Sequence, residues 1–281
     1  MATYANPQSL VSTEWLAANL NNPAVRTVEI NVDTNLYDAG HIPGAVSFNW
    51  NSQLQDQLSR DIISKNQYEA LLSEAGIRPT DTVVIYGDHS NWFAAYAFWL
   101  FKIYQHAQVR LLNGGRAKWL NDSSLPFTTD RPTLERSNYT VTAIDHTLRA
   151  KLPEVLLASQ ARSHSLVDVR SLDEFSGKVI APPGMNETAQ RGGHIPGATS
   201  IPWSTAVAPD GTFKSADELR AIYFDSLGVT PTKPAIAYCR IGERSSHSWF
   251  VLKYLLGVKD VKNYDGSWTE YGNLIGVPIE R

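Results

Sequence analysis

Cysteine is almost absent from this chain, which has a single one, Cys239, among 281 residues. One thiol cannot form an intramolecular disulfide, a CxxC redox pair, a cysteine-rich zinc site or an iron–sulfur cluster within one chain. Cys239 therefore serves either packing or chemistry.

Long hydrophobic runs are also missing. The longest uninterrupted apolar run, Trp92 to Phe101, is far shorter than the roughly 18 residues of a membrane helix. The first residues lack the basic and apolar regions of a signal peptide. The 25 basic and 28 acidic side chains are scattered and give a formal net charge of −3, which offers no footprint for nucleic acid or an anionic membrane. We expect a cytoplasmic globular protein with neither of those partners.

An internal repeat organises the sequence. Gly40-His41-Ile42-Pro43-Gly44-Ala45 recurs as Gly193-His194-Ile195-Pro196-Gly197-Ala198, and the segment 75–87 parallels 227–239. Two copies of one domain in tandem follow from this repeat. We predict an N-terminal domain over 1–131, a linker over 132–145 and a C-terminal domain over 146–281. The second copy carries extra residues between Arg170 and Gly193, rich in Gly and Pro, which we expect to form a loop.

Strand and helix patterns alternate within each copy. The short apolar runs Thr82–Tyr86 and Ala235–Tyr238 are typical of buried strands. Apolar residues at helical spacing predict helices over Trp15–Leu20, Gln67–Ala75, Phe93–Tyr104, Ala216–Leu227 and Ser246–Leu256. This alternation predicts an α/β fold, with a mainly parallel sheet in each copy and helices on both faces.

Cys239 lies where a buried strand gives way to a loop and then a helix. Ligands of parallel α/β sheets collect at such strand ends, and the helix dipole together with Arg240 and Arg244 should lower the thiol pKa below its free value of about 8.5. Gly242 should let the loop curl back toward the sulfur. A free cysteine commonly just packs as a small hydrophobe. The sister copy, however, has Gly87 at this position and neither arginine, which favours a nucleophile and a catalytically inactive first copy.

The loop Cys239-Arg240-Ile241-Gly242-Glu243-Arg244-Ser245-Ser246 resembles the active-site loop of the two-domain rhodanese family, the thiosulfate sulfurtransferases. The segment Val167-Asp168-Val169-Arg170 and the two Gly-His-Ile-Pro-Gly turns support the resemblance. It implies that Cys239 takes the outer sulfur of thiosulfate as a persulfide, held by residues 240–245, and passes it to cyanide, a small thiol or a protein thiol. Such a double displacement gives ping-pong kinetics and requires no metal or organic cofactor.

Several rival functions remain open. Phosphatases of related fold have a loop one residue longer between cysteine and arginine, which argues against phosphate. The 3-mercaptopyruvate sulfurtransferases generally carry uncharged residues after the cysteine, so Arg240 and Arg244 favour the thiosulfate dianion. A sulfur carrier or scaffold without turnover is a further alternative.

Further substrate contacts are harder to assign. Arg244 is the preferred contact, with Arg240 beside it. Members of the mitochondrial type have basic residues where this chain has Ile241 and, approximately, Glu174, so Arg170 or Arg191 is a candidate replacement. Asp168 is expected to hold an arginine near the site.

The remaining polar candidates have structural interpretations. His41 and His194 occupy the same turn in both copies, which indicates a structural role. His247, within the helix after the loop, is more typical of a packed or surface histidine than of a base. Glu243 is a candidate acceptor for donors within the loop.

Overall fold

The computed structural model describes residues 3–184 and 187–281. Their contacts divide them into two compact units. One comprises 8–146 with 208–213, and the other comprises the N-terminal residues up to 7, 147–207 and 214–281. No helix within the described residues is long and apolar enough to cross a membrane.

The unit built from the first repeat contains a five-stranded parallel sheet in the order β1-β5-β4-β2-β3. Its central strand β4 is fully buried from Val83 to Tyr86, in agreement with the apolar run seen in the sequence. The strands are β1 (Leu10–Val11), β2 (Val25–Glu29), β3 (Val46–Ser47), β4 (Thr82–Tyr86) and β5 (Val109–Leu112).

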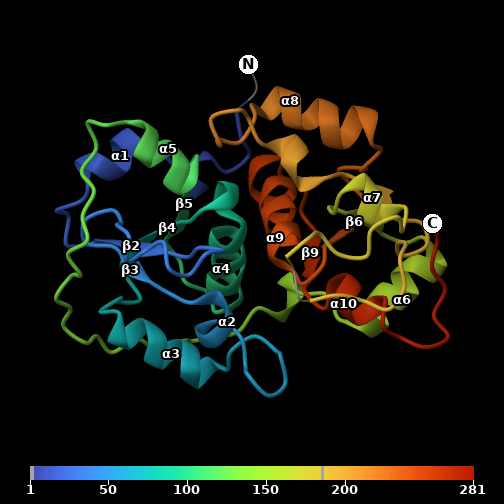
Figure 1. Ribbon diagram of the computed structural model, residues 1–281, viewed down its shortest axis with the longest axis horizontal. Helices are drawn as coiled ribbons and strands as arrows, with labels where there is room; N and C mark the ends of the chain where they lie inside the picture. The colour runs from blue at the N-terminus through green and yellow to red at the C-terminus, as the bar shows by residue number, and fades with distance from the viewer. Residues whose placement is uncertain (1–2, 185–186) are drawn as a thin grey trace. The chain divides into compact units, whose positions relative to one another are not determined.

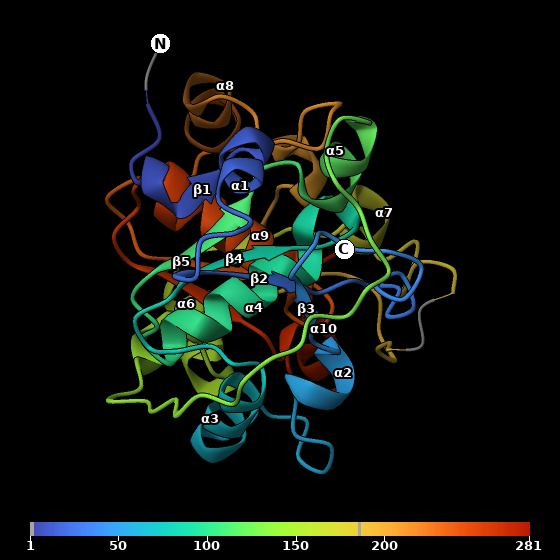
Figure 2. The ribbon, with the colours of Figure 1, turned by 90° about the vertical axis from the view of Figure 1, so that its left-hand side faces the viewer.

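Helices cover both faces of this sheet (Figure 1). Leu16 of α1 and Trp119 of α5 pack on the face that carries Val84 and Leu112. On the opposite face, α3 and α4 are joined by an aromatic contact between Tyr68 and Phe101, and Figure 2 shows α4 running alongside the strands. The helices are α1 (Thr13–Ala18), α2 (Trp50–Gln53), α3 (Lys65–Glu74), α4 (Trp92–Ile103) and α5 (Gly115–Asn121), with short 3-10 helices over Pro7–Ser9 and His89–Asn91.

The unit built from the second repeat contains a four-stranded parallel sheet in the order β7-β6-β8-β9. Helices α6 and α10 pack on one face, with Val155 and Trp268 in the same core cluster as Tyr238. Helix α9 covers the other face, where Trp249 donates to the carbonyl of Val261 at 2.9 Å. The strands are β6 (Ser165–Asp168), β7 (Thr199–Ser200), β8 (Ala235–Tyr238) and β9 (Val261–Tyr264).

The helices of this unit are labelled in Figure 1. They are α6 (Leu152–Ala161), α7 (Leu172–Phe175), α8 (Ala216–Arg220), α9 (Glu243–Phe250) and α10 (Ser267–Tyr271), with 3-10 helices over His146–Leu148 and Trp203–Ala206. Helices α8 and α9 run on into the π-helical turns Ala221–Ser226 and Val251–Leu255. The predicted α/β fold, with parallel sheets covered on both faces, is confirmed.

The extra residues of the second copy differ from the expected plain loop, because they begin with helix α7. Ser171 accepts a hydrogen bond from the backbone N–H of Glu174, and the Glu174 side chain accepts one from the N–H of Ser171. This reciprocal capping box stabilises a single helical turn.

The segment between the repeats has no regular element from Asp122 to Asp145. It is nevertheless anchored on the first unit, because Tyr139 is buried and its hydroxyl lies 2.7 Å from Nδ1 of His106.

Candidate functional site

Cys239 lies directly after strand β8, in a loop that leads into helix α9. The start of α10 fixes this loop. The backbone N–H of Cys239 donates to the Ser267 hydroxyl at 3.0 Å, and its carbonyl accepts from the N–H of Trp268 at 3.0 Å. The thiol is therefore held at the carboxyl end of a central strand, where parallel sheets gather their ligands.

Gly242 turns the loop back toward the sulfur, as the sequence predicts. Its φ is 105°, and a Cβ at this position would lie 2.8 Å from Cβ of Asp265. Only glycine accepts that conformation and that approach without strain. As a result, the backbone N–H of Gly242 donates to Cys239 Sγ at 3.2 Å.

The sulfur is enclosed by polar groups. The side chain of Cys239 is 0% exposed. Besides the Gly242 amide, Sγ lies 3.6 Å from the hydroxyl of Ser245, and the thiol donates to Oε2 of Glu243 at 3.3 Å. The sulfur thus has hydrogen-bond donors on one side and a carboxylate on the other.

The thiol pKa differs from the value expected from the sequence. Burial raises the pKa of Cys239, the negative charge of Glu243 raises it further, and Arg244 and the hydrogen bonds from Ser245 lower it by less. The expectation of a lowered pKa is therefore wrong for this arrangement. The main reason is the complete burial of the thiol, and the carboxylate of Glu243 adds to it.

Arg244 is held by Glu174 of α7. Its two terminal nitrogens donate to the two carboxylate oxygens at 2.9 and 3.0 Å, in the paired geometry that makes such contacts strong. The side chains are 4% and 1% exposed. Burial would raise the pKa of Glu174, but the contact with Arg244 outweighs it and holds that pKa below its usual range.

Arg240 is engaged in a similar way. Its guanidinium donates to the carboxylate of Glu187 and, at 3.1 Å, to the Glu187 carbonyl. A second carboxylate, that of Glu243, lies 3.6 Å from Nη2 of Arg240.

Glu243 stands between the two arginines, because its Oε1 also lies 3.5 Å from Nε of Arg244. We call these five residues the charge cluster: Glu174, Glu187, Arg240, Glu243 and Arg244. Its three carboxylates face two guanidinium groups. The surroundings of Cys239 are therefore not the net-positive cradle that loop residues 240–245 alone suggest.

The candidate arginines outside the loop are bound elsewhere. Arg170 forms a two-point ion pair with Asp168, donates to the carbonyl of Gly193 at 2.7 Å, and lies with its guanidinium carbon 4.6 Å from the ring centre of Trp268. Asp168 thus holds an arginine at the end of β6.

Arg191 donates to three backbone carbonyls beyond α10, those of Tyr271, Gly272 and Val277. These bonds tie the end of the extra segment to the C-terminal residues. In this arrangement neither Arg170 nor Arg191 directs its hydrogen bonds at the loop of Cys239.

The corresponding position of the first copy has no space for a side chain. A Cβ on Gly87 would lie 2.0 Å from the carbonyl oxygen of Ile30. Hydrogen bonds from its own side chains hold the loop after Gly87. The Asn91 side chain accepts from the N–H of Gly87 at 3.0 Å, and the Asp88 carboxylate accepts from the N–H of Val32 at 2.6 Å. A cysteine could not occupy position 87 without moving the backbone.

The three histidines named from the sequence are structurally engaged. His41 Nδ1 lies 2.9 Å from the carbonyl of Tyr37, and His194 Nδ1 lies 2.9 Å from that of Phe175. His247 is buried against Trp203, and burial lowers its pKa to about 3, so it stays neutral. The expected structural roles agree with these contacts.

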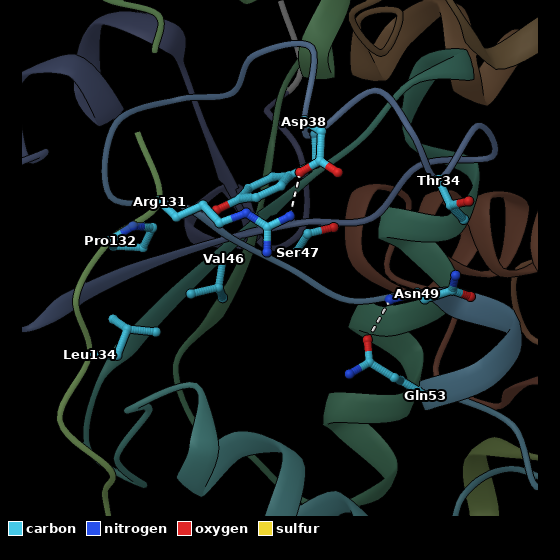
Figure 3. A pocket seen from close by; sticks show the side chains of 10 residues that line it. Thr34, Asp38, Val46, Ser47, Asn49, Gln53, Arg131, Pro132 and Leu134 are labelled. Atoms are coloured by element: carbon cyan, nitrogen blue, oxygen red, sulfur yellow. Dashed lines mark hydrogen bonds and ion pairs between the residues drawn. The ribbon is translucent and has the colours of Figure 1, made fainter. Parts of the chain in front are cut away.

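A surface pocket of about 360 Å³ lies in the first unit, beside β3 and residues 131–134 (Figure 3). The charged side chains among its lining residues are Asp38 and Arg131, which pair with each other at 2.5 Å. The remaining lining residues are Thr34, Tyr37, Val46, Ser47, Asn49, Gln53, Pro132 and Leu134. None of these side chains is a nucleophile placed beside a base, so the pocket has no equivalent of the Cys239 loop.

The pairing of the loop arginines with Glu174 and Glu187 was not predicted from the sequence. One signal was available for Glu174, because Ser171 and Glu174 have the spacing of a capping box and therefore predict a helical turn. No sequence signal indicated that this turn would face Arg244, seventy residues further on.

The chain is similar to known proteins over nearly its whole length. The family model of the rhodanese-like domain matches this chain twice, over residues 12–122 and 152–274. A protein of Mycobacterium tuberculosis named "Putative thiosulfate sulfurtransferase" is 53% identical over 272 residues, which cover 96% of this chain and 97% of the relative. The sulfur carrier protein TtuD of Thermus thermophilus is 51% identical over 282 residues, which cover 99% of this chain and 98% of TtuD.

Solved structures show the same architecture. The crystal structure of SseA from Escherichia coli, described as a 3-mercaptopyruvate sulfotransferase, superposes with a TM-score of 0.81 at 28% identity, over 92% of this chain and 98% of SseA.

Proposed function

The chain belongs to the rhodanese family, and we propose that it is a thiosulfate sulfurtransferase that carries the transferred sulfur as a persulfide on Cys239. The observation that carries this proposal is the position of the single thiol at the end of β8, with the Gly242 amide directed at Sγ. The name of the Mycobacterium tuberculosis relative supports thiosulfate as the donor.

The proposed reaction has two halves. The Cys239 thiolate attacks the outer sulfur of thiosulfate, a Cys239–sulfur bond forms, the sulfur–sulfur bond of the donor breaks, and sulfite leaves with that electron pair. An acceptor such as cyanide or a thiol then attacks the outer sulfur of the persulfide and regenerates the thiolate. The loop amides supply donors for the anionic persulfide, where charge resides in the intermediate. No step draws on a metal or organic cofactor.

The substrate contacts remain a proposal. Arg240 and Arg244 are the positively charged side chains of the loop that follows Cys239, and we propose that a dianionic sulfur donor competes with Glu174 and Glu187 for them. Arg170 and Arg191 are weaker candidates, because the hydrogen bonds that each makes go to Asp168 and to backbone carbonyls outside the Cys239 loop.

The donor 3-mercaptopyruvate is the second candidate. The charge cluster supports it, because the carboxylates offset the positive charge that would favour a dianion over a monoanion. SseA, with its 3-mercaptopyruvate description, provides structural precedent. A comparison of kcat/KM for the two donors decides between them. A sulfur carrier without turnover, as the name of TtuD suggests, would acquire the persulfide but fail to discharge it to small acceptors.

We further propose that the first copy, over 1–131, is catalytically inactive, that 132–145 is a linker, and that 146–281 is the catalytic domain. The close approach of Ile30 to Gly87 supports the inactivity of the first copy. The cytoplasmic location expected from the sequence remains a prediction.

The test of the proposed function is steady-state formation of thiocyanate from thiosulfate and cyanide. The wild-type chain should turn over with parallel double-reciprocal lines, the pattern of a double displacement, and Cys239→Ser should abolish turnover. Glu154→Gln provides a matched control in the same unit, because Glu154 forms a half-buried ion pair with Lys262 and makes no hydrogen bond or ion pair with Cys239 or its loop among the described residues. Turnover that survives in Cys239→Ser would contradict the proposal.

A further inference from the structure

The proton of the Cys239 thiol has a defined acceptor in this structure. Sγ accepts from the Gly242 N–H at 3.2 Å, and the thiol donates to Oε2 of Glu243 at 3.3 Å. Both Cys239 and Glu243 are buried, so bulk water does not compete for this contact. Among the described residues, Glu243 supplies the carboxylate that touches the sulfur.

The two deeply buried carboxylates of the charge cluster differ in how they are held. Both oxygens of Glu174 accept guanidinium hydrogen bonds from Arg244, and one also accepts from the N–H of Ser171. Oxygen Oε1 of Glu243 accepts no hydrogen bond from the described residues. A carboxylate whose two oxygens both accept hydrogen bonds from an arginine has no oxygen left for a proton. A carboxylate with one oxygen without a donor, and the other oxygen bonded to a thiol, can accept the thiol proton.

We propose that Glu243 is a further catalytic residue of the sulfur-transfer reaction, the base that takes the thiol proton of Cys239 as the sulfur attacks the donor. This inference rests on the proposed function, since it concerns the step in which Cys239 becomes a nucleophile. Glu243 qualifies as catalytic because its Oε2 contacts the reacting atom.

The step is balanced in atoms and charge. The proton moves from Sγ of Cys239 to the Glu243 carboxylate. The sulfur lone pair then forms the bond to the outer sulfur of the donor, and sulfite leaves with the electron pair of the broken sulfur–sulfur bond. When the acceptor removes the outer sulfur, the Cys239 thiolate recovers its proton from Glu243. No proton enters or leaves the site during the cycle.

An internal transfer suits the electrostatics of a buried site. If the thiol lost its proton to solvent, the thiolate and the Glu243 carboxylate would lie side by side as two like charges in a low-dielectric interior. Transfer to Glu243 leaves the net charge of the site unchanged. It also leaves a neutral carboxyl group, rather than an anion, beside the anionic persulfide.

Charged groups face Glu243 from several elements. Arg240 and Arg244 lie within 3.6 Å of its Oε1, while Cys239 faces Oε2. More distant charged and titratable groups of the neighbouring elements are Glu174 of α7, Glu187 behind Arg240, Asp265 after β9 with its partner Arg149, Asp168 and Arg170 after β6, and His247 of α9.

The alternative role for Glu243 is structural, as a spacer that holds the two arginines. The two roles predict opposite effects of Glu243→Gln, which keeps the size of the side chain and removes its charge. If Glu243 is only a spacer or a source of repulsion, the glutamine variant should form the thiolate more readily and react at least as fast as wild type. If Glu243 is the base, the variant must release the thiol proton to solvent before it can react.

The experiment is single-turnover formation of the Cys239 persulfide from thiosulfate across a pH series, followed by rapid quench and intact-mass analysis. The donor stays a dianion throughout, so the profile reports the enzyme. For wild type we expect a rate that changes less than about threefold between about pH 6 and 8, because the thiol passes its proton directly to Glu243 and not to solvent. For Glu243→Gln we expect the rate to fall about tenfold per pH unit below the thiol pKa and to approach wild type in alkali.

Two further variants sharpen the test. Glu243→Asp keeps a carboxylate one methylene shorter and should retain the flat profile at a reduced rate, whereas Glu154→Gln removes a remote carboxylate and should match wild type. A wild-type rate that itself rises about tenfold per pH unit, or a glutamine variant as fast as wild type at neutral pH, overturns the role of Glu243. The wild-type pH profile is measured on the unaltered chain, so its outcome does not depend on whether any variant folds. Absence of any wild-type persulfide overturns the proposed function as well, so the two failures are distinct.

Discussion

The ion pair between Arg244 and Glu174 is the contact of the site whose loss should cost most in stability. Its side chains are 4% and 1% exposed and are joined by two hydrogen bonds of 2.9 and 3.0 Å. Removing one partner of a buried pair costs about 3–5 kcal/mol, because the other charge is left buried without compensation. In Glu174→Gln the remaining amide oxygen still accepts one guanidinium N–H. We therefore expect a loss of about 3 kcal/mol in the free energy of unfolding, the lower end of that range.

The neighbouring Asp173 provides a matched control on the same helix. It pairs with Lys178 at 3.5 Å, and these side chains are 61% and 75% exposed. An exposed pair of this kind contributes at most about 1 kcal/mol. Urea unfolding followed by tryptophan fluorescence should therefore separate Glu174→Gln clearly from Asp173→Asn. Equal unfolding free energies for the two variants would refute the reasoning that the buried pair holds α7 against α9.

The same pair gives a pH dependence with a definite sign. Burial acts to raise the pKa of Glu174, but Arg244 outweighs it, so the pKa is lower in the folded protein than in the unfolded chain. The stabilisation is complete above the unfolded value of about 4.3 and is lost as the pH falls through the folded pKa. The stability difference between wild type and Glu174→Gln should therefore be constant near neutrality and shrink in acid. A difference that grows in acid would contradict this assignment.

Two glycines carry the remaining predictions. Gly242→Ala forces a side chain onto backbone in the left-handed region, with its Cβ 2.8 Å from Cβ of Asp265. Because the amide that faces Sγ is then displaced, kcat for sulfur transfer should fall at least tenfold, which is about 1.4 kcal/mol or more in the activation barrier. An unchanged kcat would count against the role of that amide. Gly87→Cys in a Cys239→Ser background should form no persulfide, since a Cβ there lies 2.0 Å from the Ile30 carbonyl, and a sulfur adduct at position 87 would show that the first copy retains a usable site.

Much of the fold could be predicted from the sequence, because the signals were local. The run Thr82–Tyr86 is strand β4 and the run Ala235–Tyr238 is strand β8, with the same bounds. These segments bury both faces of a parallel strand, and that requirement produces a continuous apolar run. The repeat then supplied the second domain and the equivalence of Gly87 with Cys239.

The electrostatics of the site could not be predicted in the same way. The charges of Arg240 and Arg244 are visible in the sequence, but the carboxylates that neutralise them come from α7 and from Glu187, distant along the chain. A thiol pKa depends on the sum of all neighbouring charges and on burial. Local reasoning counted the two cations alone, and so gave the wrong direction for the pKa of Cys239.

Intact-mass analysis of the protein after exposure to thiosulfate shows whether Cys239 carries the sulfur. We predict an adduct of one sulfur atom, mapped to the peptide that contains Cys239, removed by cyanide and absent from Cys239→Ser. A wild-type chain that gains no sulfur under these conditions, or one whose adduct persists in Cys239→Ser, would contradict it.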